Sequence, residues 1–410
     1  MISMKTQFDA QDIKRMSGSL LKPASAPVLE LRVGTPWLEV QGDKTYQKCR
    51  IGLGDVEKEV FFAVPNEFGE FLTYERGDAY LLGLLSFAMR ERCNFRFDVP
   101  LTGELVHQIT TELLPVLTRY SPELHFPEIK AEYSDEPLPC AGKVGTGCSC
   151  GVDSMYAIKR LTETPFSAAK VDCLAVHNVG AYTWGGRFVR MRYEYEVDHA
   201  RAFALRYGYQ LLVTDSNIAE QFPQMHEMVH TYTASFATYM LRKFWRRYYY
   251  ASAGVDLLET FRLSNIHHHH AVAHALVLMP AVSIQSLRIS TESESVTRWE
   301  KMKELIDYEP AQLFLNVCAH SVGSNCGKCY KCMRTLWQLD ALGALERFVK
   351  VFPIEQYRCN YEFYLRQLYL AHLHHQSMVG ESYDVLRRKI GIGAKVWAVV
   401  QYLKTSFSKF

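Results

Sequence analysis

The pattern of apolar and polar residues changes along the chain and divides it into regions of different predicted structure. Near the start, short alternating runs bounded by turn signals predict the strands of a small antiparallel sheet, at 28–33, 37–40 and 59–64. Apolar residues at helical spacing then predict amphipathic helices over 78–92 and 103–120. We therefore expect an α+β accessory domain over 26–135, preceded by a polar lead over 1–25.

From about residue 140 the pattern becomes one of apolar runs that alternate with helical spacing, which is typical of a parallel sheet. Near-continuous apolar segments suit buried strands, at 143–146, 171–177, 209–215, 247–252 and 281–284. The spacing between them predicts helices, at 155–161, 188–207 and 228–244. We expect a doubly wound parallel α/β domain over 140–310, a cysteine-bearing region over 311–335 and a helical region over 336–410. In doubly wound sheets, ligands lie at the carboxyl ends of the strands.

Composition limits the classes of function. Of the 410 residues, 48% are apolar, which is enough for several cores, and the net charge is +2 with both signs mixed. The charge balance therefore gives no clear indication of a nucleic-acid-binding surface, and small basic patches are the alternative. No apolar run is long enough to span a bilayer, and the segment from Met1 to Ser19 lacks the apolar core of a signal peptide. These features predict a soluble, cytoplasmic protein, in which clustered cysteines bind metal or act in catalysis rather than form disulfides.

The stretch from Gly147 to Ser154, Gly-Cys-Ser-Cys-Gly-Val-Asp-Ser, joins a predicted strand to a predicted helix. The backbone N–H groups of such a turn and the positive end of the helix dipole attract anions. Gly151 would let the backbone approach a phosphate closely. An ordinary strand-to-helix turn is the alternative. No Gly-Lys-Ser/Thr follows, so the stretch does not match a Walker loop.

The ordered string favours the anion-binding interpretation, because it resembles the Ser-Gly-Gly-x-Asp-Ser loop of the PP-loop ATP pyrophosphatases, also called the adenine nucleotide alpha hydrolase-like superfamily. The matching residues are Ser149, Gly151, Val152, Asp153 and Ser154, and Cys150 stands where the family usually has its first glycine. The resemblance implies that this loop binds ATP, with Mg²⁺ on the triphosphate. It also implies that ATP is cleaved between its α and β phosphates.

Further residues of an ATP site follow from the same resemblance. In the family, a Thr-Lys or Thr-Arg pair opens the helix after a late strand and its cation meets phosphate; Thr297 and Arg298 match this pair. Thr297 is also suited to be the helix N-cap, and the alternative for Arg298 is a solvated surface side chain. His177, Asn178 and Asp215 fall at the ends of predicted strands, where the family commonly surrounds adenosine. A loop cap or a solvated polar residue is the alternative for each of them.

Four cysteines form the strongest local pattern, Cys318-x7-Cys326-x2-Cys329-x2-Cys332. Thiolates at this spacing suit one tetrahedral Zn²⁺ ion. Four thiolates leave no open position for a water nucleophile, so we expect a structural site. An iron–sulfur cluster and redox dithiols are the alternatives.

Two other segments allow more than one interpretation. The run His267–His270 invites a metal interpretation, but four consecutive histidines cannot share one face, so we expect a polar turn or helix start. The last predicted helix, over 394–410, carries an apolar row and ends in lysines. We expect it to pack on the protein itself, and contact with a membrane surface is the alternative.

The order of the loop, the Thr-Arg pair and the cysteines resembles the 7-cyano-7-deazaguanine synthases, over about residues 140–340. The resemblance implies that a substrate carboxylate or amide oxygen is adenylated, that pyrophosphate is released, and that ammonia or an amine then displaces AMP. The expected catalytic residues are Asp153, Ser154 and Arg298, with Asp153 a metal or helix-start ligand rather than a general base. The N-terminal region is additional, so we expect a larger acceptor, such as a protein, a peptide or a sugar carboxylate.

Two other functions remain open. A PP-loop sulfur transferase would need a reactive cysteine outside the metal site, and Cys148, Cys150 and Cys173 are available. A nucleotide-binding partner or sensor would bind ATP with weak turnover or none, if Cys150 impairs catalysis. A homodimer is also compatible with the sequence.

Overall fold

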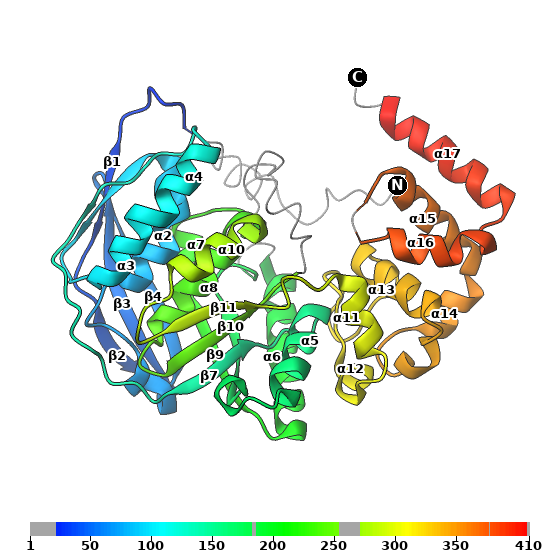
Figure 1. Ribbon diagram of the computed structural model, residues 1–410, viewed down its shortest axis with the longest axis horizontal. Coiled ribbons are helices and arrows are strands. Elements are labelled where there is room, and N and C mark those ends of the chain that lie inside the picture. The colour runs from blue at the N-terminus through cyan, green and yellow to red at the C-terminus, as the bar shows by residue number, and fades with distance from the viewer. Residues whose placement is uncertain (1–21, 183–185, 254–270, 377, 408–410) are drawn as a thin grey trace. The chain divides into compact units, whose positions relative to one another are not determined.

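The computed structural model describes residues 22–182, 186–253, 271–376 and 378–407 (Figure 1). The run His267–His270 lies outside these residues. The chain divides into two compact units. The first unit comprises Met1–Gly147 and Leu161–Glu294, and the second unit comprises Cys148–Arg160 and Ser295–Phe410.

One sheet of eleven strands forms the framework of the first unit. Five strands are parallel and adjacent, in the order β11-β10-β7-β8-β9. Their bounds are β7 Lys143–Gly147, β8 Cys173–Asn178, β9 Gln210–Ser216, β10 Trp245–Ala251 and β11 Arg288–Glu292. Counted by their place in the chain, these strands run 3-2-1-4-5 across the sheet, the order of doubly wound sheets. The expected parallel sheet is therefore confirmed, and the point where its strand order reverses lies between β7 and β10.

The remaining strands extend this sheet. They are β1 Leu29–Val33, β2 Trp37–Gln41, β3 Lys44–Leu53, β4 Val56–Pro65, β5 Cys93–Phe97 and β6 Ile129–Lys130. β4 pairs antiparallel with β9, so that Phe62 lies opposite Ser216 and Ala63 lies opposite Asp215. The alternating runs predict a separate domain over 26–135, whereas β4 here supplies backbone partners for the edge of β9. The pairing of β1 with β5 is parallel, so the strands of this region are not all antiparallel.

One apolar core joins the sheet to several helices, among them α2 (Asp78–Glu91), α8 (His226–Met240) and α10 (Ala271–Ala281). α8 packs on both α2 and α10 (Figure 1). α2 differs from the expected amphipathic helix, because its residues from Asp78 to Arg90 are all buried. Gly83 permits this close packing, since a Cβ there would lie 2.7 Å from Ile218 and 3.0 Å from Phe236. A helix buried on all sides needs apolar residues on all sides.

Other elements of the first unit follow the predicted positions with three differences. The predicted helix over 103–120 contains a π-helical turn, as α3 Gly103–Gln108, the turn Ile109–Leu113, and α4 Leu114–Tyr120. The predicted strand over 281–284 is wrong, because α10 ends at Ala281 and a single bridge joins Ile284 to Leu287. A short apolar run cannot be distinguished from the end of a buried helix by its pattern alone. β3, β5 and β6 are additional strands. The unit also contains α6 Gly186–Tyr207, α7 Ile218–Gln221 and the 3₁₀ turns Asn66–Phe71 and Ser167–Ala169.

The second unit contains helices joined by loops, as expected for 336–410. It contains α5 Val152–Glu163 up to Arg160, and the last three residues of that helix are assigned to the first unit. Its other helices are α11 Arg298–Leu305, α12 Glu309–Phe314, α13 Tyr330–Ala341, α14 Ile354–Cys359, α15 Tyr361–Leu373, α16 Gly380–Leu386 and α17 Ile392–Phe407. Two 3₁₀ turns, Leu345–Phe348 and Arg387–Lys389, lie between them. Among the described residues of both units, no helix has the length and apolar character required to cross a membrane.

Candidate functional site

The loop after β7 is a tight bend held by its own polar groups. The hydroxyl of Ser149 accepts a hydrogen bond from the backbone N–H of Gly151 at 3.3 Å and lies 3.1 Å from the hydroxyl of Ser154. Ser154 in turn donates to the carbonyl of Gly151 at 3.1 Å. The carbonyl of Cys150 accepts from the backbone N–H of Asn316 at 2.8 Å. These bonds fix the course of the backbone into α5.

Cys150 has a left-handed backbone conformation, with φ at 53°. Residues with a side chain are disfavoured in this left-handed region of backbone angles, whereas glycine adopts it readily. The backbone at Cys150 therefore has a conformation that glycine adopts more easily than cysteine. The PP-loop family, which the sequence resembles, usually has glycine at this position. The Cys150 side chain is buried, and its sulfur lies 3.9 Å from that of Cys148.

The bend leads directly into the first turn of α5. The carbonyl of Gly151 accepts from the N–H of Met155 at 2.9 Å, which closes the first helical turn. In this geometry the N–H groups of Val152, Asp153 and Ser154 have no acceptor within the helix. Together with the helix dipole, they make the start of α5 electropositive.

Two buried cations from α11 share the carboxylate of Asp153. Lys301 has 0% of its side chain exposed, and its Nζ donates to Oδ1 of Asp153 at 3.0 Å. Arg298, 6% exposed, places a guanidinium nitrogen 3.9 Å from Oδ2 of Asp153. The two cations are three residues apart and so lie on one face of α11. Asp153 therefore joins the start of α5 to this cationic face.

A third cation, Arg334 of α13, influences the charge of Arg298. Burial and, next, the charge of Arg334 lower the pKa of Arg298 to about 10, although Asp153 acts in the opposite direction. Arg298 therefore remains charged at neutral pH. Its second terminal nitrogen donates to the hydroxyl of Thr335 at 3.2 Å. Within the described residues, the buried Nε atoms of Arg298 and Arg334 have no hydrogen-bond partner. An anion would satisfy such donors.

Thr297 is the N-cap of α11, as expected. Its hydroxyl accepts from the N–H of Glu300 at 3.2 Å, and its own N–H donates to the Glu300 carboxylate at 2.8 Å. The bond from the Thr297 backbone lowers the pKa of Glu300. This reciprocal cap fixes where α11 begins and hence where Arg298 lies.

The three residues predicted around adenosine lie in the first unit, at the carboxyl ends of β8 and β9. His177 Nδ1 lies 2.8 Å from the hydroxyl of Thr214, and burial lowers the pKa of His177 to about 4, so the ring is neutral at pH 7. Asn178 donates to the carboxylate of Asp215 at 2.7 Å. The buried Nε2 of His177 and the amide oxygen of Asn178 have no partner within the described residues. The strand ends thus carry polar groups with hydrogen-bonding capacity left over.

Asp215 also lines a pocket of about 400 Å³ in the first unit. Thr214 of β9 and Tyr193 of α6 form part of its wall. The N-terminal strands and the turn before β3 form another part, through Asp43, Lys44, Ala63 and Pro65. The N-terminal strands therefore contribute directly to a cavity beside the end of β9.

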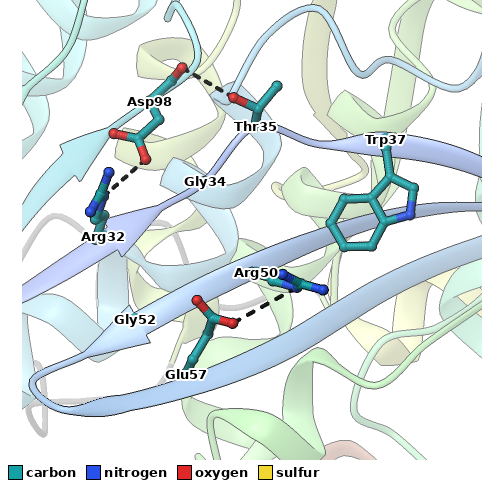
Figure 2. A pocket seen from close by; sticks show the side chains of 8 residues that line it. All are labelled: Arg32, Gly34, Thr35, Trp37, Arg50, Gly52, Glu57 and Asp98. Atoms are coloured by element: carbon teal, nitrogen blue, oxygen red, sulfur yellow. Dashed lines mark hydrogen bonds and ion pairs between the residues drawn. The ribbon is translucent and has the colours of Figure 1, made fainter.

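A second pocket of the first unit, of about 540 Å³, lies among the N-terminal strands (Figure 2). Its charged side chains neutralise each other: Arg32 pairs with Asp98 at 2.9 Å and Arg50 with Glu57 at 3.8 Å. Arg50 also lies 5.7 Å from the ring centre of Trp37. Because each guanidinium already has a carboxylate, this pocket is a weaker candidate for a polyphosphate than the start of α5.

The four predicted metal ligands converge in the second unit. The sulfur atoms of Cys318, Cys326, Cys329 and Cys332 all lie within 4.8 Å of one another, and two pairs are 3.9 Å apart. A tetrahedral ion with zinc–sulfur distances of about 2.3 Å requires sulfur separations of about 3.8 Å. The cluster therefore fits a single metal ion such as zinc.

The surrounding chain supports this cluster. Backbone N–H groups of Lys328 and Cys329 point to the sulfur of Cys326, at 3.4 and 3.3 Å, as in a metal-binding turn. Gly327 permits that turn with φ at 71°, and its carbonyl accepts from the hydroxyl of Tyr364 at 3.0 Å. Asn325 ties the loop to its neighbours through the carbonyls of Leu315 and Val351.

Comparison of the chain with protein-family models, curated proteins and solved structures found no match.

The structure brings together several residues that the sequence singled out and adds others. The loop residues, Asp153, Thr297 and Arg298 lie together in the second unit, which also holds the four cysteines. Lys301 was not among the predicted residues, and Arg334 was not predicted as part of the ATP site. The sequence contains one signal for Lys301, since it lies three residues after Arg298 on the same helix. Arg334 has no such signal, because its position depends on how α13 packs on α11.

Proposed function

We propose that the chain is an ATP-dependent, AMP-forming ligase that adenylates a carboxylate or amide oxygen of its substrate and joins the activated carbon to ammonia or an amine. One observation carries the proposal: two buried cations, Lys301 and Arg298, converge on Asp153 at the electropositive start of α5. Buried cations are costly unless they are paired. The buried Nε atoms of Arg298 and Arg334 have no hydrogen-bond partner among the described residues, and a pyrophosphate group would supply acceptors for them.

The proposed reaction assigns a role to each of these groups. The loop of Ser149, Cys150 and Gly151 and the first N–H groups of α5 bind the β and γ phosphates of ATP. The substrate oxygen attacks the α phosphorus, the bond from that phosphorus to the β-phosphate oxygen breaks, and pyrophosphate leaves. Arg298 and Lys301 stabilise the charge that develops on pyrophosphate. The nitrogen nucleophile then attacks the activated carbon, and AMP leaves with the substrate oxygen. Mg²⁺ bound to the triphosphate would neutralise further charge.

The acceptor is proposed to be larger than a purine-sized molecule. The pocket of about 400 Å³ beside the end of β9 supports this, because the N-terminal strands form part of its wall. His177, Asn178 and Asp215 are proposed to bind a ligand of the first unit, since ligands of parallel sheets lie at the carboxyl ends of strands. The four-cysteine cluster is proposed to hold zinc as a structural ion.

Sulfur transfer is a weaker proposal. Burial raises the pKa of the Cys173 thiol to about 12, which leaves almost no thiolate at neutral pH. Cys148 and Cys150 are also buried. A nucleotide sensor with little turnover remains the second candidate, because Cys150 replaces a family glycine within the loop itself.

The test is ATP binding by calorimetry together with pyrophosphate and AMP release, measured on the full chain with candidate carboxylates and ammonium. Lys301→Met and Arg298→Met should each weaken binding or slow pyrophosphate release by at least tenfold. Lys303→Met is the matched control, because Lys303 lies on the same helix with an exposed side chain. Phosphate release without AMP would exclude the reaction. ATP binding without any pyrophosphate release would favour the sensor.

A further inference from the structure

The last described helix, α17, has apolar residues on two opposite sides. Its inner side packs on α15, with Ala394 and Ala398 buried. On the same helix, the ring of Trp397 lies 4.8 Å from the guanidinium of Arg366 of α15, so this indole is engaged within the unit. The interaction with α15 therefore confirms the expected packing of this helix on the protein, but it uses only part of the helix surface.

The outer side of α17 is an exposed apolar row. Its members are spaced so that they lie on one face of the helix, and they are Ile392, Val396, Val399, Val400 and Leu403. Val396 is 57% exposed and Ile392 is 82% exposed. Single exposed apolar side chains are ordinary on protein surfaces, whereas a contiguous row marks a surface that contacts something apolar.

The charged residues beside the apolar row indicate what kind of surface it contacts. At about 100° per residue, Lys395 lies about 90° to one side of the apolar row and Lys404 about 90° to the other. Both lysines are exposed. From Val385 to Phe410 the chain contains six lysines and arginines and no aspartate or glutamate. An apolar row with cations on both sides is complementary to a surface that is apolar at its centre and anionic around it.

A second copy of the chain does not fit this description, because two such helices would bring lysines against lysines. A groove on an acidic protein fits the charge, but the five exposed members of the row are all aliphatic, whereas aromatic side chains usually anchor such contacts. The row is aliphatic, and Trp397 is engaged with Arg366 instead. Aliphatic side chains suit lipid acyl chains, and the lysines can extend their ammonium groups to lipid phosphates.

We propose that α17 docks this protein on the surface of an anionic membrane, with its apolar row in the acyl boundary and Lys395 and Lys404 at the headgroups. This inference does not depend on the proposed ATP reaction. The contact is peripheral: the helix lies along the surface and remains packed on α15.

Sedimentation of the full chain with lipid vesicles tests the proposal. We expect the protein to sediment with vesicles of equal parts phosphatidylglycerol and phosphatidylcholine, and much less with phosphatidylcholine alone. Val396→Asp should abolish this binding. Val56→Asp should not, and it is a matched control because Val56 is also 57% exposed. Lys395→Gln with Lys404→Gln should weaken binding about 30-fold at low salt, from about 1 kcal/mol per lysine.

Several results would overturn the proposal. The first is an absence of binding to the anionic vesicles, and the second is binding that Val396→Asp leaves intact. Equal binding to both kinds of vesicle would refute the electrostatic part. A dimer in solution that Val396→Asp dissociates would assign the row to a contact between copies. Retention of an acidic protein through the row, without vesicle binding, would assign it to a protein partner. Circular dichroism of each variant shows whether the fold is kept.

Discussion

The conformation of Cys150 shows how one residue can limit what the loop tolerates. Its left-handed φ of 53° is compatible with glycine and costly for side chains, above all for β-branched ones. Its thiol is buried, however, so a change to glycine removes packing as well as strain. Strain and packing therefore oppose each other at this position.

We predict that Cys150→Gly changes the free energy of unfolding by less than about 1 kcal/mol, because relief of strain offsets lost packing. Cys150→Val should lower it by about 2 kcal/mol or more, since valine is poorly compatible with this conformation. Urea unfolding of both variants measures the difference. Equal stability of the two would show that the loop does not hold this conformation in solution.

His177 provides a prediction about pH. Burial lowers its pKa to about 4, from an ordinary value near 6.5. The unfolded chain therefore binds this proton more readily than the folded chain between these two values, and stability falls as the pH is lowered through the window. We expect His177→Gln to reduce this loss by about 1–3 kcal/mol.

The measurement for His177 is denaturant unfolding at several pH values between 4 and 7. His107→Gln is the control, because His107 is exposed on α3. A pH dependence that is the same in His177→Gln as in the natural chain would contradict the prediction.

At the scale of elements, a buried ion pair connects α2 to the segment between α8 and β10. Arg242 donates to the carboxylate of Asp78, and both side chains are almost fully buried. The same carboxylate accepts from the backbone N–H of Thr102 at 2.8 Å and from its hydroxyl at 2.6 Å. Removing either charge would leave the other buried without its partner.

We predict that Asp78→Ala and Arg242→Met each lower the free energy of unfolding by about 3–5 kcal/mol. The double variant should lose less than the sum, because it leaves no unpaired charge. Chemical unfolding of the three variants completes the double-mutant cycle. If the two losses add to within about 0.5 kcal/mol, the two groups are not coupled.

Most elements could be predicted from the sequence, because their apolar pattern is local. The strand β8 begins as a continuous apolar run, and Thr297 with Glu300 has the spacing of a helix cap. The site residues that sequence reasoning missed depend on packing between elements. Lys301 forms part of the site only because it contacts Asp153, which lies 148 positions earlier in the chain. The order of the strands and the extension through β4 likewise depend on long-range pairing, which no local pattern contains.

At the scale of the whole molecule, the two units differ in what stabilises them. The first unit has an extensive core on its sheet. The second unit has short helices, and its loop from Cys318 to Cys332 would be held by a metal ion. A structural zinc site contributes its binding free energy to folding.

We predict that the purified chain contains about one zinc ion and that a strong chelator lowers its melting temperature. Cys332→Ser should have the same effect, because three remaining thiolates leave the shell open. Cys359→Ser is the control, since Cys359 is exposed and lies outside the cluster. Metal analysis and thermal unfolding provide the measurements. Finding iron instead of zinc would contradict the proposed identity of the ion. A melting temperature that neither the chelator nor Cys332→Ser changes would refute its structural role.

The pairing of β4 with β9 has a practical consequence for anyone who shortens this chain. A fragment that starts near β7 would retain the parallel strands but lose the neighbour that covers β9. Uncovered strand edges recruit other molecules into intermolecular sheets, so such a fragment should be prone to aggregation. Expression and crystallisation efforts should keep the N-terminal strands, even when only the parallel strands are of interest.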